Sequence, residues 1–208
     1  MRIIRSICGR MDGIRNDIKS KYWDYIDYYN DGEVWADTVL FEAFGGKNLQ
    51  GNVFYIYKEI FEKEEYKDCK LIISHQQPEI IIEYLKKRIL YDQRVTVVKT
   101  HSSDYRRALS HAKYLINNVS FSMDFIKKPN QIYLNTWHGT PLKFLGRRIR
   151  NDAFECNNAQ RNFLMADYIL TPNELTKKVF NEDYMIQGIV PGRIVDGGYP
   201  RNSVFFDD

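Results

Sequence analysis

From Thr38 onward, short apolar runs alternate with longer amphipathic segments, and this alternation constrains the fold more than any other feature. The runs lie at residues 39–41, 71–74, 95–98, 114–116, 132–134, 168–170 and 194–195. The amphipathic segments lie between them, at residues 53–62, 78–89, 104–111, 157–165 and 173–180. Strands that alternate with helices favour an open parallel sheet, and continuous apolar runs are typical of strands buried on both faces. We therefore expect an α/β fold, a Rossmann-like, mainly parallel sheet with helices on both faces.

Residues 1–37 precede this pattern and are rich in charged and aromatic side chains. Apolar residues recur there at spacings of three and four, which predicts an amphipathic helix; they are Ile14, Ile18, Tyr22, Tyr25 and Ile26. Acidic residues are mixed with the basic ones, which favours a helix packed on the domain over the alternative, a basic membrane-binding surface. We expect an N-terminal helical extension over residues 1–37 and a Rossmann-like domain over residues 38–208.

Composition narrows the class of protein further. The 208 residues carry a formal net charge of +3, which does not call for a nucleic-acid partner. The three cysteines form no Cys-x-x-Cys pair, and the four histidines are not arranged with carboxylates or cysteines as metal ligands. We expect no metal, no cofactor and a reducing, cytoplasmic setting. No apolar stretch is long enough for a membrane-spanning helix or a secretory signal.

Ligands of open α/β sheets bind at the carboxyl ends of the strands, so the loops that follow the apolar runs are the candidate site. The first of these loops contains Gly45, Gly46 and Lys47, without the spacing of a P-loop. Another begins at Asn135 and reads Asn-Thr-Trp-His-Gly-Thr-Pro-Leu-Lys through residue 143. In it, His138 stands beside a glycine that permits a sharp turn or a close ligand. The alternative is a hydrogen-bonded core histidine in a tight turn.

The segment at residues 137–143, Trp-His-Gly-Thr-Pro-Leu-Lys, resembles the signature of the CDP-glycerol:poly(glycerophosphate) glycerophosphotransferase family, the teichoic acid primases and polymerases. Three further segments are similar to the family in the same order, at residues 39–47, 161–174 and 198–202. Four ordered motifs are far more specific than any one of them. The sequence departs from the family pattern at Arg147, where an acidic residue is usual nearby, and at Ser203, where Asp is usual.

The resemblance implies the N-terminal, acceptor-side half of a GT-B fold, with the donor-nucleotide half absent from this chain. It implies transfer of glycerol phosphate, or another polyol phosphate, from a CDP-activated donor to an acceptor hydroxyl with release of CMP, and no metal. His138 is then the catalytic residue. The expected substrate-binding residues are Gly45, Gly46, Lys47, Trp137, Gly139, Thr140, Lys143, Arg147, Arg148 and Arg150.

The last four of these residues form a basic cluster that suits an anionic polyol phosphate or lipid-linked acceptor, because arginine binds phosphate in bidentate fashion. The alternative is a solvated charged face. Arg201 reads as a structural residue near an interdomain linker. A lipid-linked acceptor would place the protein at the inner face of the cell membrane, and a peripheral membrane contact stays open.

Two other functions remain from the sequence. One is a non-catalytic module that binds a polyanion or a partner, and the other is half of a nucleotide-sugar glycosyltransferase, which shares the two-domain architecture. The isolated chain is expected to be inactive because the donor half is missing. The sequence does not separate glycerol from ribitol, or priming from polymerisation.

Overall fold

The computed structural model describes residues 25–149 and 153–206. Seven strands form one sheet in the order β3-β2-β1-β4-β5-β6-β7, and every neighbouring pair is parallel. The strands are β1 (Trp35–Glu42), β2 (Lys70–His75), β3 (Val95–Lys99), β4 (Ala112–Asn117), β5 (Ile132–Asn135), β6 (Tyr168–Thr171) and β7 (Arg193–Asp196). The predicted α/β class with a parallel sheet is confirmed, and each of the seven apolar runs is a strand.

Five helices connect the strands: α2 (Gly51–Glu62), α3 (Pro78–Lys87), α4 (Ser103–His111), α5 (Ala153–Met165) and α6 (Glu174–Asp183). Short 3-10 turns supplement them: η1 (Phe44–Gly46), η2 (Glu64–Tyr66), η3 (Gly146–Arg148) and η4 (Pro200–Phe205). Pro78 occupies the first turn of α3, where its missing N–H costs nothing. The side chain of Asn173 caps α6 by accepting the amide of Thr176 at 2.9 Å.

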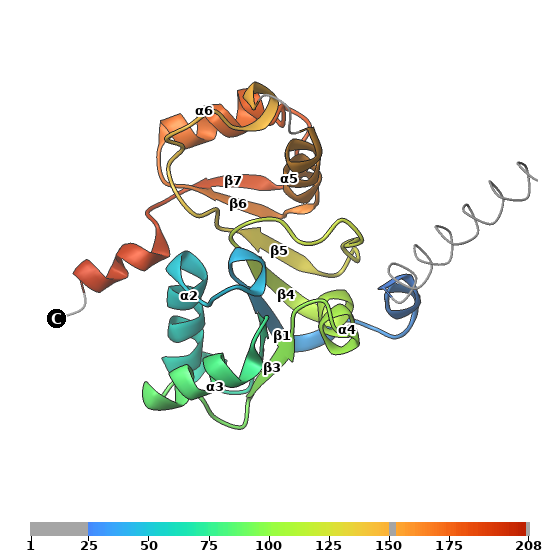
Figure 1. Cartoon of the computed structure of the whole chain (residues 1–208), viewed down its shortest axis with the longest axis vertical. Helices are drawn as coiled ribbons and strands as arrows, with labels where there is room; N and C mark the ends of the chain where they lie inside the picture. The colour runs from blue at the N-terminus through green and yellow to red at the C-terminus, as the bar shows by residue number, and fades with distance from the viewer. Residues whose placement is uncertain (1–24, 150–152, 207–208) are drawn as a thin grey trace, which may run out of the picture.

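The helices cover both faces of the sheet, as β1 illustrates. Val39 and Phe41 point to the face covered by α2 and α3, while Leu40 points to the face covered by α4 and α5. This alternation follows from the two-residue period of a strand. Figure 1 shows α2 and α3 on one side of the strands and α4 and α5 on the other. The two apolar cores on either side hold the sheet in place.

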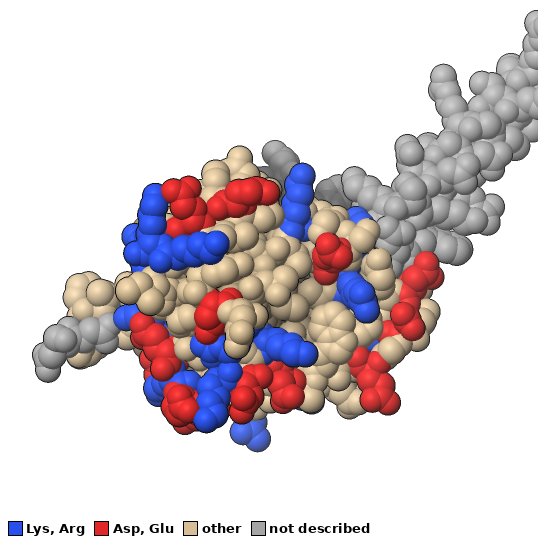
Figure 2. Space-filling model, turned by 90° about the horizontal axis from the view of Figure 1, so that it is seen from below, with Lys and Arg blue, Asp and Glu red and all other residues tan. Residues whose placement is uncertain are grey.

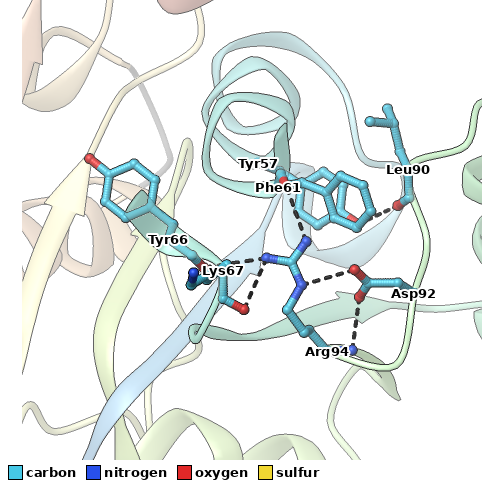
Figure 3. A network of polar contacts seen from close by, with 7 residues as sticks. All are labelled: Tyr57, Phe61, Tyr66, Lys67, Leu90, Asp92 and Arg94. Atoms are coloured by element: carbon cyan, nitrogen blue, oxygen red, sulfur yellow. Dashed lines mark hydrogen bonds and ion pairs between the residues drawn. The ribbon is translucent and has the colours of Figure 1, made fainter. Parts of the chain in front are cut away.

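Arg94 fastens the far end of α2 to the start of β3 (Figure 3). Its guanidinium donates to the Phe61 carbonyl at 3.0 Å and to the Asp92 carboxylate at 2.9 Å, and it lies 4.9 Å from the Phe61 ring centre. The Tyr57 hydroxyl donates to the Leu90 carbonyl at 2.6 Å beside it. These contacts sit at the amino edge of the sheet. The opposite end of α2, which begins at Gly51, is thereby held at the carboxyl edge.

The predicted N-terminal helix lies partly outside the described residues, as do Ile14, Ile18 and Tyr22. Residues 25–30 are helical, and Tyr25 is completely buried in the core on the α4 face. Its hydroxyl donates to the Ile126 carbonyl at 2.7 Å. The described end of this segment therefore packs on the domain, and β1 begins at Trp35, before the boundary expected at residue 38.

On the face seen in Figure 2, Lys and Arg side chains lie interspersed with Asp and Glu. Mixed signs of this kind fit the small formal net charge of +3. No helix among residues 25–149 and 153–206 combines the length and the apolar character needed to cross a bilayer.

Candidate active site

The loop that follows β5 lies at the carboxyl edge of the sheet, next to the end of β4. Asn135 closes β5 and pairs with Asn117, the last residue of β4. One residue further on, the Thr136 amide donates to the Asn117 carbonyl at 2.9 Å, which continues the ladder into the loop. His138 therefore stands where the fold rule for open parallel sheets places a ligand.

A hydrogen bond to the backbone of Asn118 orients the His138 ring. Its Nδ1 lies 2.8 Å from the backbone carbonyl oxygen of Asn118. A carbonyl only accepts, so Nδ1 carries a proton and donates it. In the neutral imidazole, Nε2 then bears the lone pair and is the nitrogen able to take up a proton. The ring is half-buried, between Trp137 at 4.3 Å and Phe44 at 6.0 Å from centre to centre.

Trp137, which directly precedes His138, is buried in the hydrophobic core. Its side chain is 5% exposed and packs on the rings of Phe163, Phe180 and Tyr184 at 5.2–6.0 Å. Its backbone adopts φ of 51°, a conformation that a bulky residue rarely takes and that needs support from its surroundings. The burial of the indole fixes the residue that precedes His138.

Buried asparagines supply that support. The Asn135 side chain accepts the Trp137 amide at 3.0 Å, and the Asn52 side chain donates to the Trp137 carbonyl at 3.1 Å. Asn118 accepts the Phe44 amide at 2.8 Å through its side chain and holds His138 through its backbone. All three asparagines are at most 1% exposed. Asn135 opens the loop that was expected to form the site, whereas Asn52 and Asn118 were not expected there, although Asn117 and Asn118 directly follow an apolar run.

The glycine loop after β1 reaches the site through Phe44. Gly45 and Gly46 have φ of 62° and 72°. A Cβ on Gly46 would lie 1.9 Å from Thr100 Oγ1, so only glycine fits there. The Gly46 carbonyl accepts the Gln76 amide at 2.7 Å, which ties the loop to the end of β2. Lys47 is exposed at the end of this loop.

Gly139 and Thr140 continue from His138 and are both half-buried. A Cβ on Gly139 would meet no atom within 4 Å, which leaves open space above the backbone. Thr140 Oγ1 accepts from the Asn173 side chain at 2.9 Å, so the loop is joined to the cap of α6. These contacts bring residues from the ends of β5 and β6 together.

The described residues of the basic cluster, Lys143, Arg147 and Arg148, are all exposed. Arg148 pairs with the buried Asp183 of α6 at 3.3 Å and lies 4.7 Å from the Phe144 ring centre. Arg150 lies outside the described residues. Arg148 therefore has a structural contact in addition to any contact with a substrate.

Arg201 is brought to the site from the end of the described chain. Its guanidinium Nη1 donates to the His138 carbonyl at 2.8 Å, and its backbone amide contacts the Asn52 side chain at 3.4 Å. The sequence interpretation made it a structural residue near a linker. Its place in the Gly-Tyr-Pro-Arg-Asn segment after β7 was the one available signal that it belongs at the carboxyl edge.

Ionisable groups behind the loop include one buried carboxyl group. Glu42 ends β1, is 2% exposed, and accepts from the Asn117 side chain at 3.3 Å. Its burial raises its pKa to about 7. Within the described parts of the chain, no three His, Cys, Asp or Glu side chains gather in a way that could hold a metal ion.

Comparison with known proteins gives one consistent result. A family model described as CDP-Glycerol:Poly(glycerophosphate) glycerophosphotransferase matches residues 30–208. The teichoic acid poly(glycerol phosphate) polymerase of Staphylococcus epidermidis is 29% identical over 197 residues, which are 91% of this chain and 25% of that protein. The teichoic acid glycerol-phosphate transferase of Staphylococcus aureus is 28% identical over 174 residues, which are 80% of this chain and 41% of that protein.

Solved structures of the wall teichoic acid polymerase TagF have the same fold. One matches with a TM-score of 0.72 and 27% identity, over 98% of this chain and 49% of that one. Another, a histidine-to-asparagine variant soaked with CDPG, matches with a TM-score of 0.73 and 26% identity, over 98% of this chain and 51% of the other. The chain thus spans between a quarter and about half of the relatives described here.

Proposed function

This chain belongs to the CDP-glycerol:poly(glycerophosphate) glycerophosphotransferase family, and from that membership we propose that it forms the acceptor-side half of a teichoic-acid-type glycerophosphotransferase. Residues 38–208 are the acceptor-side domain in this proposal, and residues 1–37 are its extension. The donor-nucleotide half is supplied by polypeptide outside these 208 residues. The share of the relatives that this chain covers, between 25% and about half, supports that division.

The proposed reaction transfers glycerol phosphate from CDP-glycerol to a hydroxyl of an anionic polyol phosphate or lipid-linked acceptor. The acceptor oxygen forms a bond to the β-phosphorus while the bond between that phosphorus and the bridging oxygen breaks. The electron pair leaves with CMP. The soak of a TagF crystal with CDPG supports this class of donor. A lipid-linked acceptor would also bring the chain to the inner face of the membrane.

His138 is the proposed general base, and the hydrogen bond from its Nδ1 to the Asn118 carbonyl is the observation that carries this assignment. That bond leaves Nε2 as the basic nitrogen, and neutral imidazole is suited to accept the hydroxyl proton near pH 7. Positioning and stabilisation of charge supply much of the remaining catalysis in phosphoryl transfer.

The other residues take different parts in this proposal. Trp137 positions His138, since its ring is buried and out of reach of a substrate. Gly139 and Thr140 border the open space beside the base. The predicted substrate contacts of Gly45, Gly46, Lys47, Lys143, Arg147, Arg148 and Arg150 stay predictions. Exposed cations such as Lys143 and Arg147 suit the phosphates of a polymeric acceptor.

Substitution of His138 tests the proposal in an enzyme preparation that combines this chain with a donor-binding half. A positioned general base contributes roughly a hundred- to ten-thousand-fold to the rate, so His138→Ala should lower CMP release by a factor in that range. His138→Gln should fail as well, because an amide does not take up a proton. Melting temperatures should stay near that of the parent, because His138 lies in a loop.

The matched control is His101→Asn. His101 is exposed and has φ of 66°, a conformation that asparagine tolerates. The His101→Asn variant should therefore keep full turnover. A well-folded His138→Ala protein with near-normal CMP release would exclude His138 as the base. Loss of stability with normal turnover per folded molecule would instead identify it as a structural histidine.

A further inference from the structure

We propose that a phosphate group of the substrate binds beside His138, between the guanidinium of Arg201 and the first turn of α2. This subsite rests on the proposed function, because it takes the anionic group of the same reaction. Nothing in the sequence motifs assigned Arg201 or α2 to the substrate. Three independent features of the described residues meet at this place.

The first feature is the position of Arg201. Its backbone amide contacts the side chain of Asn52, the second residue of α2, while its guanidinium reaches the His138 carbonyl at 2.8 Å. The guanidinium also lies 4.4 Å from the Tyr199 ring centre, which limits its movement. The remaining N–H groups of the fork make no hydrogen bond or ion pair with any described residue. A half-buried arginine whose guanidinium has unused N–H donors is well suited to bind a phosphate.

The second feature is the start of α2, a helix of 12 residues that begins at Gly51. Its N-cap residue, Gln50, makes no side-chain cap hydrogen bond, and its first turn holds no acidic residue. The amides of a first helical turn have no partner within the helix, and the helix dipole favours an anion there. A phosphate at this end would meet both requirements.

The third feature is an unpartnered donor aimed at the same helix end. Asn118 is fully buried, and its side-chain oxygen is already used by the Phe44 amide. That bond fixes the orientation of the amide group, so Nδ2 points the other way. Nδ2 has no hydrogen-bond partner among the described residues and lies 4.0 Å from where a Cβ on Gly51 would be. Since Gly51 has no Cβ, an oxygen atom lodged there would satisfy this donor.

The subsite connects directly to the proposed chemistry. The same Asn118 that offers Nδ2 holds the His138 ring through its backbone carbonyl. A phosphate bound here would lie close to the base, where its charge is compensated by Arg201. Two sources share this chemistry: the last phosphate of the acceptor chain, and the phosphate that leaves the CDP donor with its glycerol.

Titration of the chain with inorganic phosphate, followed by amide NMR spectra, tests the subsite without any turnover. We expect resonance shifts of residues 51–53 and of the Asn118 side-chain amide. Arg201→Gln should weaken phosphate binding by roughly tenfold or more, because it removes a charge-assisted hydrogen bond. Arg201→Lys keeps the charge but not the planar fork, so its affinity should lie between the two.

Arg88→Gln is the matched control. Arg88 also lies over a tyrosine ring, 3.7 Å from the centre of Tyr84, but it is exposed at the end of α3. Its replacement should leave phosphate binding unchanged. Parallel titrations with CDP-glycerol and with a short glycerol phosphate oligomer identify the source, since the physiological one should shift the same resonances at lower concentration.

Phosphate binding by Arg201→Gln equal to that of the parent, in a protein with an intact amide spectrum, overturns the subsite. The subsite is also overturned if phosphate shifts the resonances of Lys143 and Arg147 in the parent protein but not those of residues 51–53. This outcome holds whatever the variants show. Neither outcome bears on His138, whose role is measured by CMP release. The subsite and the proposed function can therefore fail separately.

Discussion

At the scale of single residues, the site depends on buried polar groups that lie one layer behind His138. The Asn118 carbonyl selects the ring nitrogen that can act as a base, and Asn52 and Asn135 hold the Trp137 backbone from two sides. The hydrogen bonds that these groups do make favour one geometry, because an alternative would leave more buried donors and acceptors without a partner. The orientation of the His138 ring is thus a property of this layer.

Glu42 belongs to the same layer and should make stability depend on pH. Burial raises its pKa in the native protein to about 7, from 4.5 for a free side chain. Between these values the native state holds a proton that the unfolded chain releases, so the free energy of unfolding falls as the pH rises through this range and levels off above it. The difference between the two pKa values corresponds to roughly 3 kcal/mol.

We therefore predict that Glu42→Gln removes the fall in the free energy of unfolding as the pH rises. The glutamine amide keeps the shape of the side chain but carries no charge at any of these pH values. Denaturant unfolding at pH 5 and at pH 8.5 should give a smaller difference for the variant than for the parent. Glu83→Gln is the control, since Glu83 pairs with Lys87 on the exposed surface of α3 and should leave the difference unchanged. An unaltered pH dependence in Glu42→Gln would mean that another group causes it.

At the scale of elements, the loop after β1 is shaped by its contact with the loop after β3. Gly46 lies against Thr100, whose hydroxyl is held by Ser74 at 2.9 Å. This contact sets the course of η1 and so the place of Phe44 beside His138. The geometry at His138 therefore depends on the fit between Gly46 and Thr100, although neither residue contacts the histidine ring directly.

Alanine at the two glycines of this loop separates backbone strain from collision. Gly45→Ala and Gly46→Ala both place a Cβ at positive φ, which costs about 1–2 kcal/mol. Only the Cβ at Gly46 collides with another atom, so Gly46→Ala should lose a further ~1–3 kcal/mol. Equilibrium unfolding of the two variants gives the comparison. Equal losses would show that Thr100 moves aside freely.

At the scale of the whole molecule, all the loops described above open on one edge of a single parallel sheet. Among the described residues, the ends of β1, β4 and β5 and the segment after β7 line the site from one side. A ligand that is held from one side stays largely solvated. Its few contacts with the protein therefore offset little of the entropic cost of binding. This geometry agrees with a chain that spans about half of the TagF structures it matches.

We predict that this chain by itself binds CDP-glycerol only weakly and releases no CMP from it. Calorimetric titration should give a dissociation constant far above the micromolar range, and a CMP assay with a glycerol phosphate oligomer should stay at background. A complete TagF, tested alongside, is the positive control for both assays. Micromolar binding or CMP release by these 208 residues alone would contradict the division into halves.

Local patterns in the sequence determined the elements of this protein. Seven apolar runs became seven strands because β-branched and aromatic side chains in a short run pack on both faces of a parallel sheet. The helix starts at Pro78 and Asn173 are local features too, because the missing N–H of proline and the cap of asparagine act within one helical turn. The loop that carries His138 was also found in this way, since the rule for carboxyl-edge loops needs only the order of strands and helices.

Only the tertiary structure decided how those elements meet. The strand order, the burial of Trp137 and the approach of Arg201 to His138 depend on contacts between distant parts of the chain; Arg201 and Asn52, for example, are 149 positions apart. Such contacts produce no periodic pattern in the sequence, because each depends on how all the elements pack on both faces of the sheet. The same holds for Glu42, whose pKa is a consequence of burial rather than of its neighbours in sequence. The sequence thus identified the catalytic candidate, and packing alone determined what surrounds it.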